Sequence, residues 1–253
     1  MQGRKAAGGQ ARQPQGLKNI VCGVRGAVCV HEGHRQRIKQ KFMSDPDGFA
    51  QHELLELLLF YAIPRRDTNE VAHRLMDAFG SFSAVCDAPL ESLANVEGIG
   101  SNAALLIKMI PHYCRRYLDD KVDDSRKIVT TEDAGSILLS KYIGRINETV
   151  ILMLMDSKGK LLFCGVVNEG TVNAADIYIR KVVELAMRYN ASKAILAHNH
   201  PSGVALPSRD DLRSTVAVRE ALALVGVRLI DHIIVADLDY VSIADSNLGD
   251  EIF

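Results

Sequence analysis

The sequence lacks the features of a disulfide-stabilised or membrane-spanning protein. Its five cysteines are scattered and form no Cys-x-x-Cys pair, which disfavours a disulfide framework or a cysteine zinc site. The N-terminus has no uninterrupted apolar core like that of a signal peptide. The longest apolar stretch, residues 54–63, is broken by Glu56 and is too short to span a bilayer. We therefore expect a reduced, cytoplasmic protein without a membrane segment.

Charge is nearly balanced over the 253 residues, at a net −1, but it is unevenly distributed. Residues 1–42 hold nine Lys or Arg and a single acid, Glu32. Such a basic arm can contact a polyanion, although charged tails are often only solvated. Because residues 1–30 are rich in Gly, Gln, Ala and Arg without apolar periodicity, we predict a disordered basic tail there.

Residues 31–118 show the spacing of apolar residues that is typical of helices. The segment 49–62 is apolar on most sides and is therefore predicted to lie at the centre of a small bundle. A third helix is expected to end at Gly80, as a C-cap. Before the turn described next, helices are predicted at 31–43, 49–62, 67–79 and 81–87.

A helix, the turn Val96-Glu97-Gly98-Ile99-Gly100 and a second helix follow. This pattern resembles a helix-hairpin-helix unit. In that family two glycines bring backbone N–H groups close to a phosphate at a helix N-terminus, so the resemblance implies sequence-independent DNA binding through residues 31–118. The turn contains an acid, however, and no Lys or Arg directly follows it. A hairpin that only packs two helices is an equally supported alternative.

A change of pattern marks a second domain. Residues 119–130 are charged, as expected of an exposed linker. Beyond them helices and strands alternate, and two of the strands are joined by a short Gly-containing turn that predicts a hairpin. We expect an α/β domain with a mixed sheet over residues 131–253. Its helices are predicted at 131–142, 175–189 and 208–225, and its strands at 148–155, 161–167, 193–197, 228–236 and 240–244.

Two histidines, His198 and His200, follow the predicted strand at 193–197. Because successive side chains of a strand point to opposite faces, both imidazoles can reach one metal ion. Asp211, in the first turn of a helix that begins near Ser208, is the natural third ligand. Three protein ligands leave a tetrahedral zinc ion one open position, as in catalytic rather than structural sites.

Each part of this pattern has an ordinary explanation when taken alone. Two histidines on a strand are more often surface or core residues than ligands, and Ser208 followed three residues later by Asp211 is simply a capping box. Taken together, His-x-His-Pro, seven residues between the second histidine and the serine, and Ser-x-x-Asp resemble the JAMM (MPN+) metalloprotease motif. The consecutive letters His-Asn-His do not indicate an HNH nuclease, whose three residues are dispersed along the chain.

The JAMM resemblance also implies an upstream glutamate at the start of a strand. Glu148 occupies that place, and Glu169 at the end of the next strand is the alternative. In this interpretation Glu148 is the general acid and base, and Ser208 hydrogen-bonds the developing oxyanion. Phosphodiester hydrolysis is less favoured because a single metal lacks the two-metal clamp usual in nucleases.

A wider resemblance covers about residues 31–253. It is carried by the helical region with its hairpin, by His198-Asn199-His200-Pro201-Ser202-Gly203 with Pro207-Ser208, and by Leu229-Ile230-Asp231-His232-Ile233-Ile234. Together these resemble bacterial RadC-like proteins. The resemblance implies a cytidine-deaminase-like JAMM fold, one zinc ion, cleavage of a peptide or isopeptide bond, and a name inherited from DNA repair. A satisfied histidine is the expected role of His232. The alternative function is a DNA-binding module whose metal site is structural or vestigial, and neither the protein substrate nor the oligomeric state is predicted.

Overall fold

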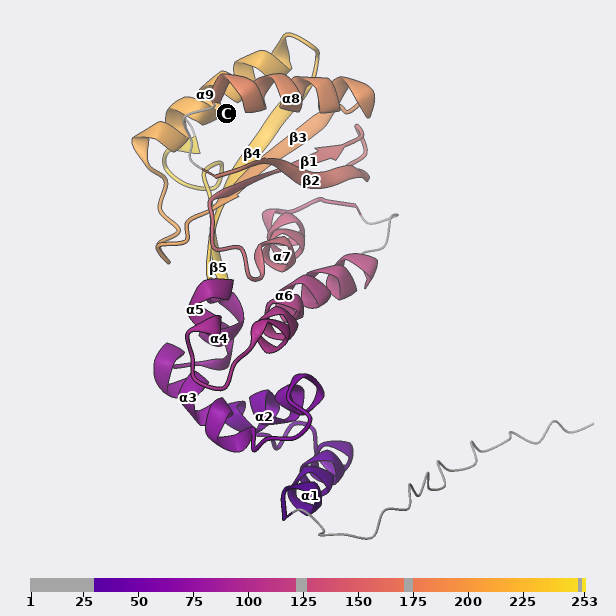
Figure 1. Cartoon of the computed structure of the whole chain (residues 1–253). Helices are drawn as coiled ribbons and strands as arrows, with labels where there is room; N and C mark the ends of the chain where they lie inside the picture. Colours follow the sequence, from indigo (N-terminus) through magenta and orange to yellow (C-terminus); the bar gives the residue numbers. More distant parts are fainter. Residues whose placement is uncertain (1–29, 122–126, 171–174, 250–251) are drawn as a thin grey trace, which may run out of the picture.

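A computed structural model describes residues 30–121, 127–170, 175–249 and 252–253, which form a helical region followed by an α/β region (Figure 1). The helical region contains α1 (Val30–Ser44), α2 (Gln51–Ala62), α3 (Asn69–Phe79), α4 (Phe82–Asp87), α5 (Leu90–Ala94) and α6 (Ser101–Lys121). The predicted tail lies outside the described residues except for Val30, which begins α1. Within the described residues, no helix is both long and apolar enough to cross a membrane.

Helix α2 lies at the centre of the helical region, as its apolar pattern predicts. Its Leu55 and Leu59 are fully buried and belong to one cluster with Leu75 of α3 and Ile107 of α6. Helix α1 is fixed to α2 by polar contacts, including Lys41 with Glu53 at 2.6 Å. The apolar cluster thus stabilises the interior of the helical region, and polar contacts attach α1 to it.

The turn between α5 and α6 needs glycine at one position. Gly98 has a φ of +95°, and a Cβ there would come within 2.8 Å of Val71. The helix, turn and helix are thus present, while the assignment of this unit to the helix-hairpin-helix family stays a prediction.

The first residues of the linker predicted at 119–130 belong to a helix in the structure. Helix α6 continues to Lys121, and near its charged end Arg116 pairs with Asp120 one turn later at 3.2 Å. After the undescribed residues 122–126, Ile128 is already buried, and its N–H donates to the carbonyl of Gly159. Charged composition alone does not distinguish an exposed helical turn from a linker.

The α/β region contains one five-stranded mixed sheet, as predicted. The strand order is β2-β1-β3-β4-β5; β3 and β4 are parallel, and the other neighbours are antiparallel. The strands are β1 (Thr149–Met155), β2 (Leu161–Glu169), β3 (Lys193–Asn199), β4 (Arg228–Ala236) and β5 (Asp239–Ser242), and the helices are α7 (Thr131–Tyr142), α8 (Ala175–Arg188) and α9 (Arg209–Ala223).

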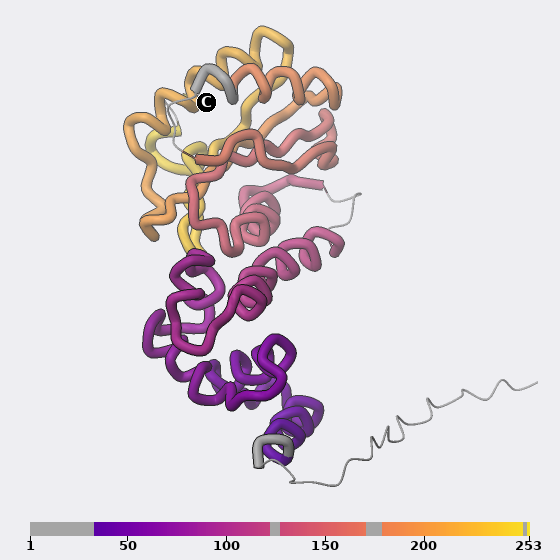
Figure 2. Tube along the Cα trace, viewed as in Figure 1, coloured from indigo at the N-terminus to yellow at the C-terminus, as the bar shows by residue number. Residues whose placement is uncertain are grey.

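Helices cover both faces of this sheet, with α8 and α9 on one side and α7 on the other (Figures 1 and 2). The side chains of β1 divide accordingly. Leu152 and Leu154 belong to the apolar cluster with α8 and α9, whereas Ile151 and Met153 belong to the cluster with α7. The two-residue period of a strand thus assigns each side chain of β1 and β3 to one of two cores.

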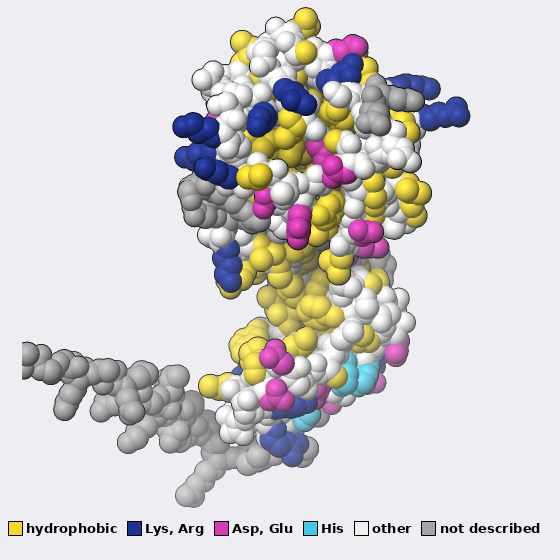
Figure 3. All heavy atoms as spheres, turned by 180° about the vertical axis from the view of Figure 1, so that it is seen from behind, with side chains coloured by type: hydrophobic (Ala, Val, Ile, Leu, Met, Phe, Trp, Pro, Cys, Tyr) yellow, Lys and Arg dark blue, Asp and Glu magenta, His cyan; other side chains and the backbone are white. Residues whose placement is uncertain are grey.

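The two regions meet along α6 and the segment that follows α7. Hydrophobic side chains gather between them on the face shown in Figure 3. Polar contacts add to this packing, since Lys141 of α7 lies 2.7 Å from Asp119, and Arg115 donates to the carbonyl of Ile143. Gly144, with a φ of +66°, packs against Pro111 where a side chain would collide.

Replacing Leu59 with Ala tests the helical core. We expect the free energy of unfolding to fall by about 2–5 kcal/mol, because the change removes apolar contacts and leaves a cavity. Leu105→Ala on α6 is the matched control, since that leucine is 54% exposed; its effect is expected within about 0.5 kcal/mol. Urea unfolding followed by circular dichroism measures both. Equal losses in the two variants would contradict this assignment of the core.

Candidate metal centre

Three predicted ligands converge where β3 ends and α9 begins. The Nε2 atoms of His198 and His200 are 2.9 Å apart. The carboxylate of Asp211, in the first turn of α9, places one oxygen 3.2 Å from Nε2 of His198 and the other 3.5 Å from Nε2 of His200. The strand alternation that predicted a shared face for the histidines is therefore observed.

These separations fit the space around one metal ion. Ligand atoms at about 2.0–2.2 Å from a tetrahedral zinc ion lie roughly 3.3 Å from one another. The Nε2 atoms of the two histidines are 2.9 Å apart, and Oδ1 of Asp211 lies 3.2 Å from Nε2 of His198, so both separations are close to this value. Two imidazoles and a carboxylate form a donor set that suits zinc and other divalent transition metals. His198, His200 and Asp211 could therefore hold a metal ion.

A chain of hydrogen bonds fixes the tautomer of His198. The hydroxyl of Thr215 donates to the backbone carbonyl of Asp211 at 2.6 Å, so its oxygen accepts from Nδ1 of His232 at 2.6 Å. Burial, with the nearby His198 as a second cause, holds the pKa of His232 well below its ordinary value, so this imidazole is neutral. Its Nε2 must then accept from Nδ1–H of His198 at 2.8 Å. In the neutral ring of His198, Nε2 is therefore the unprotonated nitrogen, and it points into the site.

The same tautomer of His200 is set by a single hydrogen bond. Its Nδ1 lies 2.9 Å from the carbonyl oxygen of Val204, which can only accept. Nδ1 therefore carries the proton, and Nε2 presents a lone pair. Two lone pairs 2.9 Å apart repel each other unless a cation or a proton lies between them. Hydrogen bonds on the outer nitrogens thus prepare both imidazoles for a cation.

Asp211 takes part in the cap of α9 as well as in the cluster. Its Oδ2 accepts from the N–H of Ser208 at 2.7 Å and from the hydroxyl of Ser208 at 2.6 Å. Burial opposes ionisation most strongly, yet the adjacent imidazole of His198 and the hydrogen bonds from Ser208 together hold the pKa of Asp211 well below its ordinary value. The carboxylate is therefore ionised, as a metal ligand must be.

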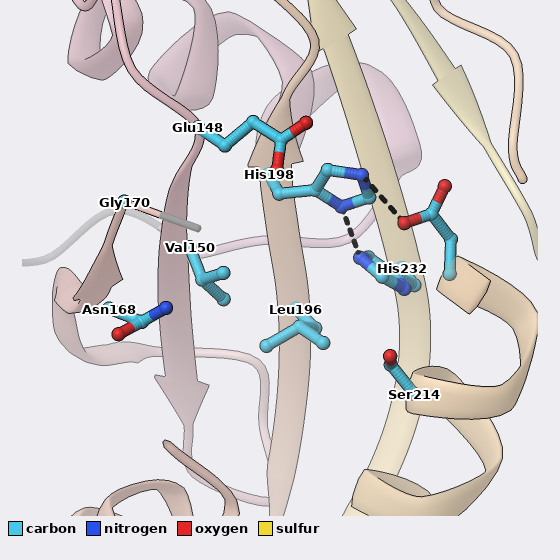
Figure 4. Close-up of a pocket in the computed structure, with 9 residues that line it drawn as sticks. Glu148, Val150, Asn168, Gly170, Leu196, His198, Ser214 and His232 are labelled. Atoms are coloured by element: carbon cyan, nitrogen blue, oxygen red, sulfur yellow. Dashed lines mark hydrogen bonds and ion pairs between the residues drawn. The ribbon is translucent and has the colours of Figure 1, made fainter. Parts of the chain in front are cut away.

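The two candidate glutamates lie in different surroundings. Glu148 lines a pocket together with His198 and Asp211, and Figure 4 shows its side chain extending from the start of β1 toward His198. Glu169 is half exposed and pairs with Arg145 at 3.6 Å. The geometry favours Glu148 as the residue that can act on a molecule in the pocket. The pocket is lined by Glu148, Val150, Asn168, Gly170, Leu196, His198, Asp211, Ser214 and His232.

The hydroxyl of Ser208 is engaged in the capping box that its sequence context predicts. Ser208 Oγ accepts from the N–H of Asp211 at 3.2 Å while donating to the carboxylate of the same residue. The capping role is thus confirmed. Its role toward an oxyanion stays a prediction, because the hydroxyl proton is directed at Asp211.

Two residues that support the cluster belong to no motif that the sequence displays. Thr215 is fully buried and ends the hydrogen-bond chain behind His198. Its position four residues after Asp211, hence on the same face of α9, is the signal that could have identified it. Asn199, between the two histidines, is also buried, and its contacts run to the other face of the sheet. His232 is the satisfied histidine that the sequence predicts.

Comparison with known proteins agrees with this geometry. Residues 128–248, which include the whole sheet and the cluster, match the family of the RadC-like JAB domain. A UPF0758 protein from Fusobacterium nucleatum subsp. nucleatum is 31% identical over 226 residues, which span 86% of this chain and 97% of that protein. The chain therefore belongs to the UPF0758 family of bacterial RadC-like proteins.

Metal binding can be tested by replacing one ligand. We expect the wild-type chain to bind about one zinc ion, and His200→Ala to lower the affinity by more than about 100-fold, since even the loss of a group that hydrogen-bonds a ligand costs roughly 10–100-fold. His73→Ala, an exposed histidine of α3, is the matched control and should leave binding unchanged. Calorimetric titration and elemental analysis measure both. Equal zinc binding by the two variants would rule out this site.

Proposed function

We propose that this chain is a zinc-dependent hydrolase of the JAMM type that cleaves a peptide or isopeptide amide bond. The observation that carries the proposal is the convergence of His198, His200 and Asp211 beside a pocket that His198, Asp211 and Glu148 line together. An acid or base beside a three-ligand site is the arrangement used to hydrolyse unactivated carbonyl compounds. Membership of the family supports the fold of this site, whereas the chemistry rests on the residues themselves.

Glu148 has the central role in the reaction we propose. Zinc supplies Lewis acidity toward a carbonyl oxygen and toward water. The carboxylate of Glu148 accepts a proton from the attacking water as the new C–O bond forms. It then passes that proton to the amine nitrogen as the C–N bond breaks. General acid and base catalysis of this kind contributes roughly a hundred- to ten-thousand-fold.

In this proposal Ser208 hydrogen-bonds the oxygen of the substrate carbonyl as negative charge develops on it. It stands at the N-terminus of α9, where the helix dipole favours negative charge. Its hydroxyl would turn from Asp211 toward the developing oxyanion, and the backbone N–H of Ser208 would still hold the carboxylate. Ser208 would thus keep its backbone N–H and the acceptor side of its Oγ for the helix cap and use its hydroxyl proton in catalysis.

Glu148→Gln tests whether Glu148, and not the alternative Glu169, is the acid and base of the proposed reaction. We expect this variant to bind zinc normally and to lose about 10²–10⁴-fold in turnover, because the amide cannot take the proton. Glu169→Gln is the matched control and should keep both properties. Turnover is measured on a panel of fluorogenic peptides and Lys-ε-linked isopeptides, and mass spectrometry identifies what stays bound to Glu148→Gln. Unchanged turnover in that variant would contradict the proposal.

DNA binding by residues 31–118 is the second candidate function. Helix α6 begins at Ser101, directly after the turn, and the first N–H groups of a helix lack partners within it, as a phosphate site requires. Against it, Arg74 beside the turn is already engaged by Glu70 at 2.7 Å and by the backbone carbonyl of Glu97 at 3.3 Å. If DNA binding were the function of this chain, its metal site would be structural or vestigial.

A substitution that adds an acid at the start of α6 tests whether this turn binds DNA. If the turn binds phosphate, Ser101→Glu should weaken binding to duplex DNA and reduce the salt dependence of the affinity by about one unit of slope. Met187→Glu, on exposed α8, adds the same charge elsewhere. Fluorescence anisotropy between about 50 and 200 mM salt measures both. If the two variants bind DNA equally, the hairpin is not the binding site.

A further inference from the structure

Asn199 stands between the two histidines of the metal centre but faces the other side of the sheet. Strand alternation turns its side chain away from His198 and His200 and toward the face covered by α7, on which Ala197 also lies. Only 5% of Asn199 is exposed. Metal binding does not require an amide at this position, and a buried amide is costly unless it is hydrogen-bonded. The contacts of Asn199 therefore indicate what the residue does.

All the hydrogen bonds of this amide go to one short segment. Its Oδ1 accepts from the N–H of Thr149 at 2.8 Å. Its Nδ2 donates to the carbonyl of Asn147 at 3.2 Å and to that of Arg145 at 3.4 Å. The three bonds thus reach both chain neighbours of Glu148.

These bonds continue the sheet where its backbone pairing stops. The pairing between β1 and β3 ends at Val150 opposite His198, so Thr149 would next face the backbone of Asn199. The side chain of Asn199 takes over the N–H of Thr149 instead, and that residue is fully buried. Buried backbone groups need such a partner.

The segment that receives these bonds has no regular structure of its own. Residues 143–148 connect α7 to β1 without helix or strand. The backbone carbonyl of Glu148 accepts from the N–H of Gly170 at 2.9 Å, on the side away from Asn199. The backbone at Glu148 is therefore held between Gly170 and Asn199, and Asn199 is the last residue of β3, between the candidate ligands His198 and His200.

We infer that Asn199 is a positioning residue that fixes Glu148 relative to the metal centre. It joins the strand of the histidines to the segment of the acid and base, so a displacement of one moves the other. This inference rests on the proposed function of Glu148. An amide is required because the contact needs an acceptor for Thr149 and donors for Asn147 and Arg145 at once. Aspartate retains only the acceptor.

Amide hydrogen exchange tests the contact without any turnover. In the full-length chain, the N–H of Thr149 should be protected, and Asn199→Ala should make it exchange at least about tenfold faster. The N–H of Leu152, inside β1, should be unaffected. Asn147→Ala is the matched control, because Asn147 is exposed and contributes only its backbone carbonyl. Equal exchange at Thr149 in Asn199→Ala and wild type overturns the inference.

Kinetics and zinc titration on the same variants test the consequence. Asn199→Ala should bind zinc within about twofold of wild type, keep KM on the peptide and isopeptide panel, and lose about 100-fold in kcat, as expected of a misplacement near 1 Å. A large loss of zinc affinity would mean that Asn199 supports the ligands instead, and unchanged kcat would also overturn the inference. If Asn199→Ala does not fold, Asn199→Asp decides: reduced kcat with normal zinc binding supports the inference, and wild-type kcat rejects it. A wild-type chain without hydrolytic activity would refute the proposed function, while the exchange result would still judge the contact.

Discussion

The structure of the centre depends on one electrostatic constraint: two imidazole lone pairs and a carboxylate must point at the same small volume. Unless a cation is bound there, this arrangement is repulsive, so each ring must be held from behind. The carbonyl of Val204 holds His200, and the neutral His232 with Thr215 holds His198. Since a backbone carbonyl ends each chain of bonds and can only accept, the protons cannot redistribute without breaking a bond. The lone pairs are therefore directed inward before any metal arrives.

The topology of the sheet brings Glu148, the proposed acid and base, to this point. Strand β1 runs antiparallel to β3, so the start of β1 lies beside the end of β3, although Glu148 and His198 are fifty residues apart. Because the pairing register fixes which residues meet, a slip of one residue would turn His198 toward the α7 face and bury it in the wrong core. The alternating apolar residues of β1 and β3 prevent such a slip. The packing of two cores thus sets the geometry of a polar site.

The parts of this site that follow from local periodicity could be predicted from the sequence. The spacing of His198 and His200 depends only on strand alternation, and the Ser208 and Asp211 pair depends only on the geometry of a helix start. The mixed sheet followed from the same periods. Glu148 was reached through a family resemblance, because nothing in its own neighbourhood distinguishes it from a solvated residue. The contacts of Thr215 and Asn199 depend on how distant elements meet, which a one-dimensional pattern does not contain. The end of α6 was missed because charged residues suit a linker and an exposed helix equally well.

The pair formed by Ser208 and Asp211 couples the stability of α9 to the chemistry of the site. A carboxylate has lone pairs enough to accept both bonds from Ser208 on Oδ2 and still direct Oδ1 at His198. Replacing Asp211 would therefore remove a candidate metal ligand and also weaken a helix cap that contributes about 0.5–2 kcal/mol. Loss of activity in such a variant would have two explanations. His200 has no such second role in a helix cap, because its outer nitrogen contacts a single carbonyl in the turn after β3. The imidazole ligands therefore separate binding from folding, whereas the carboxylate ligand does not.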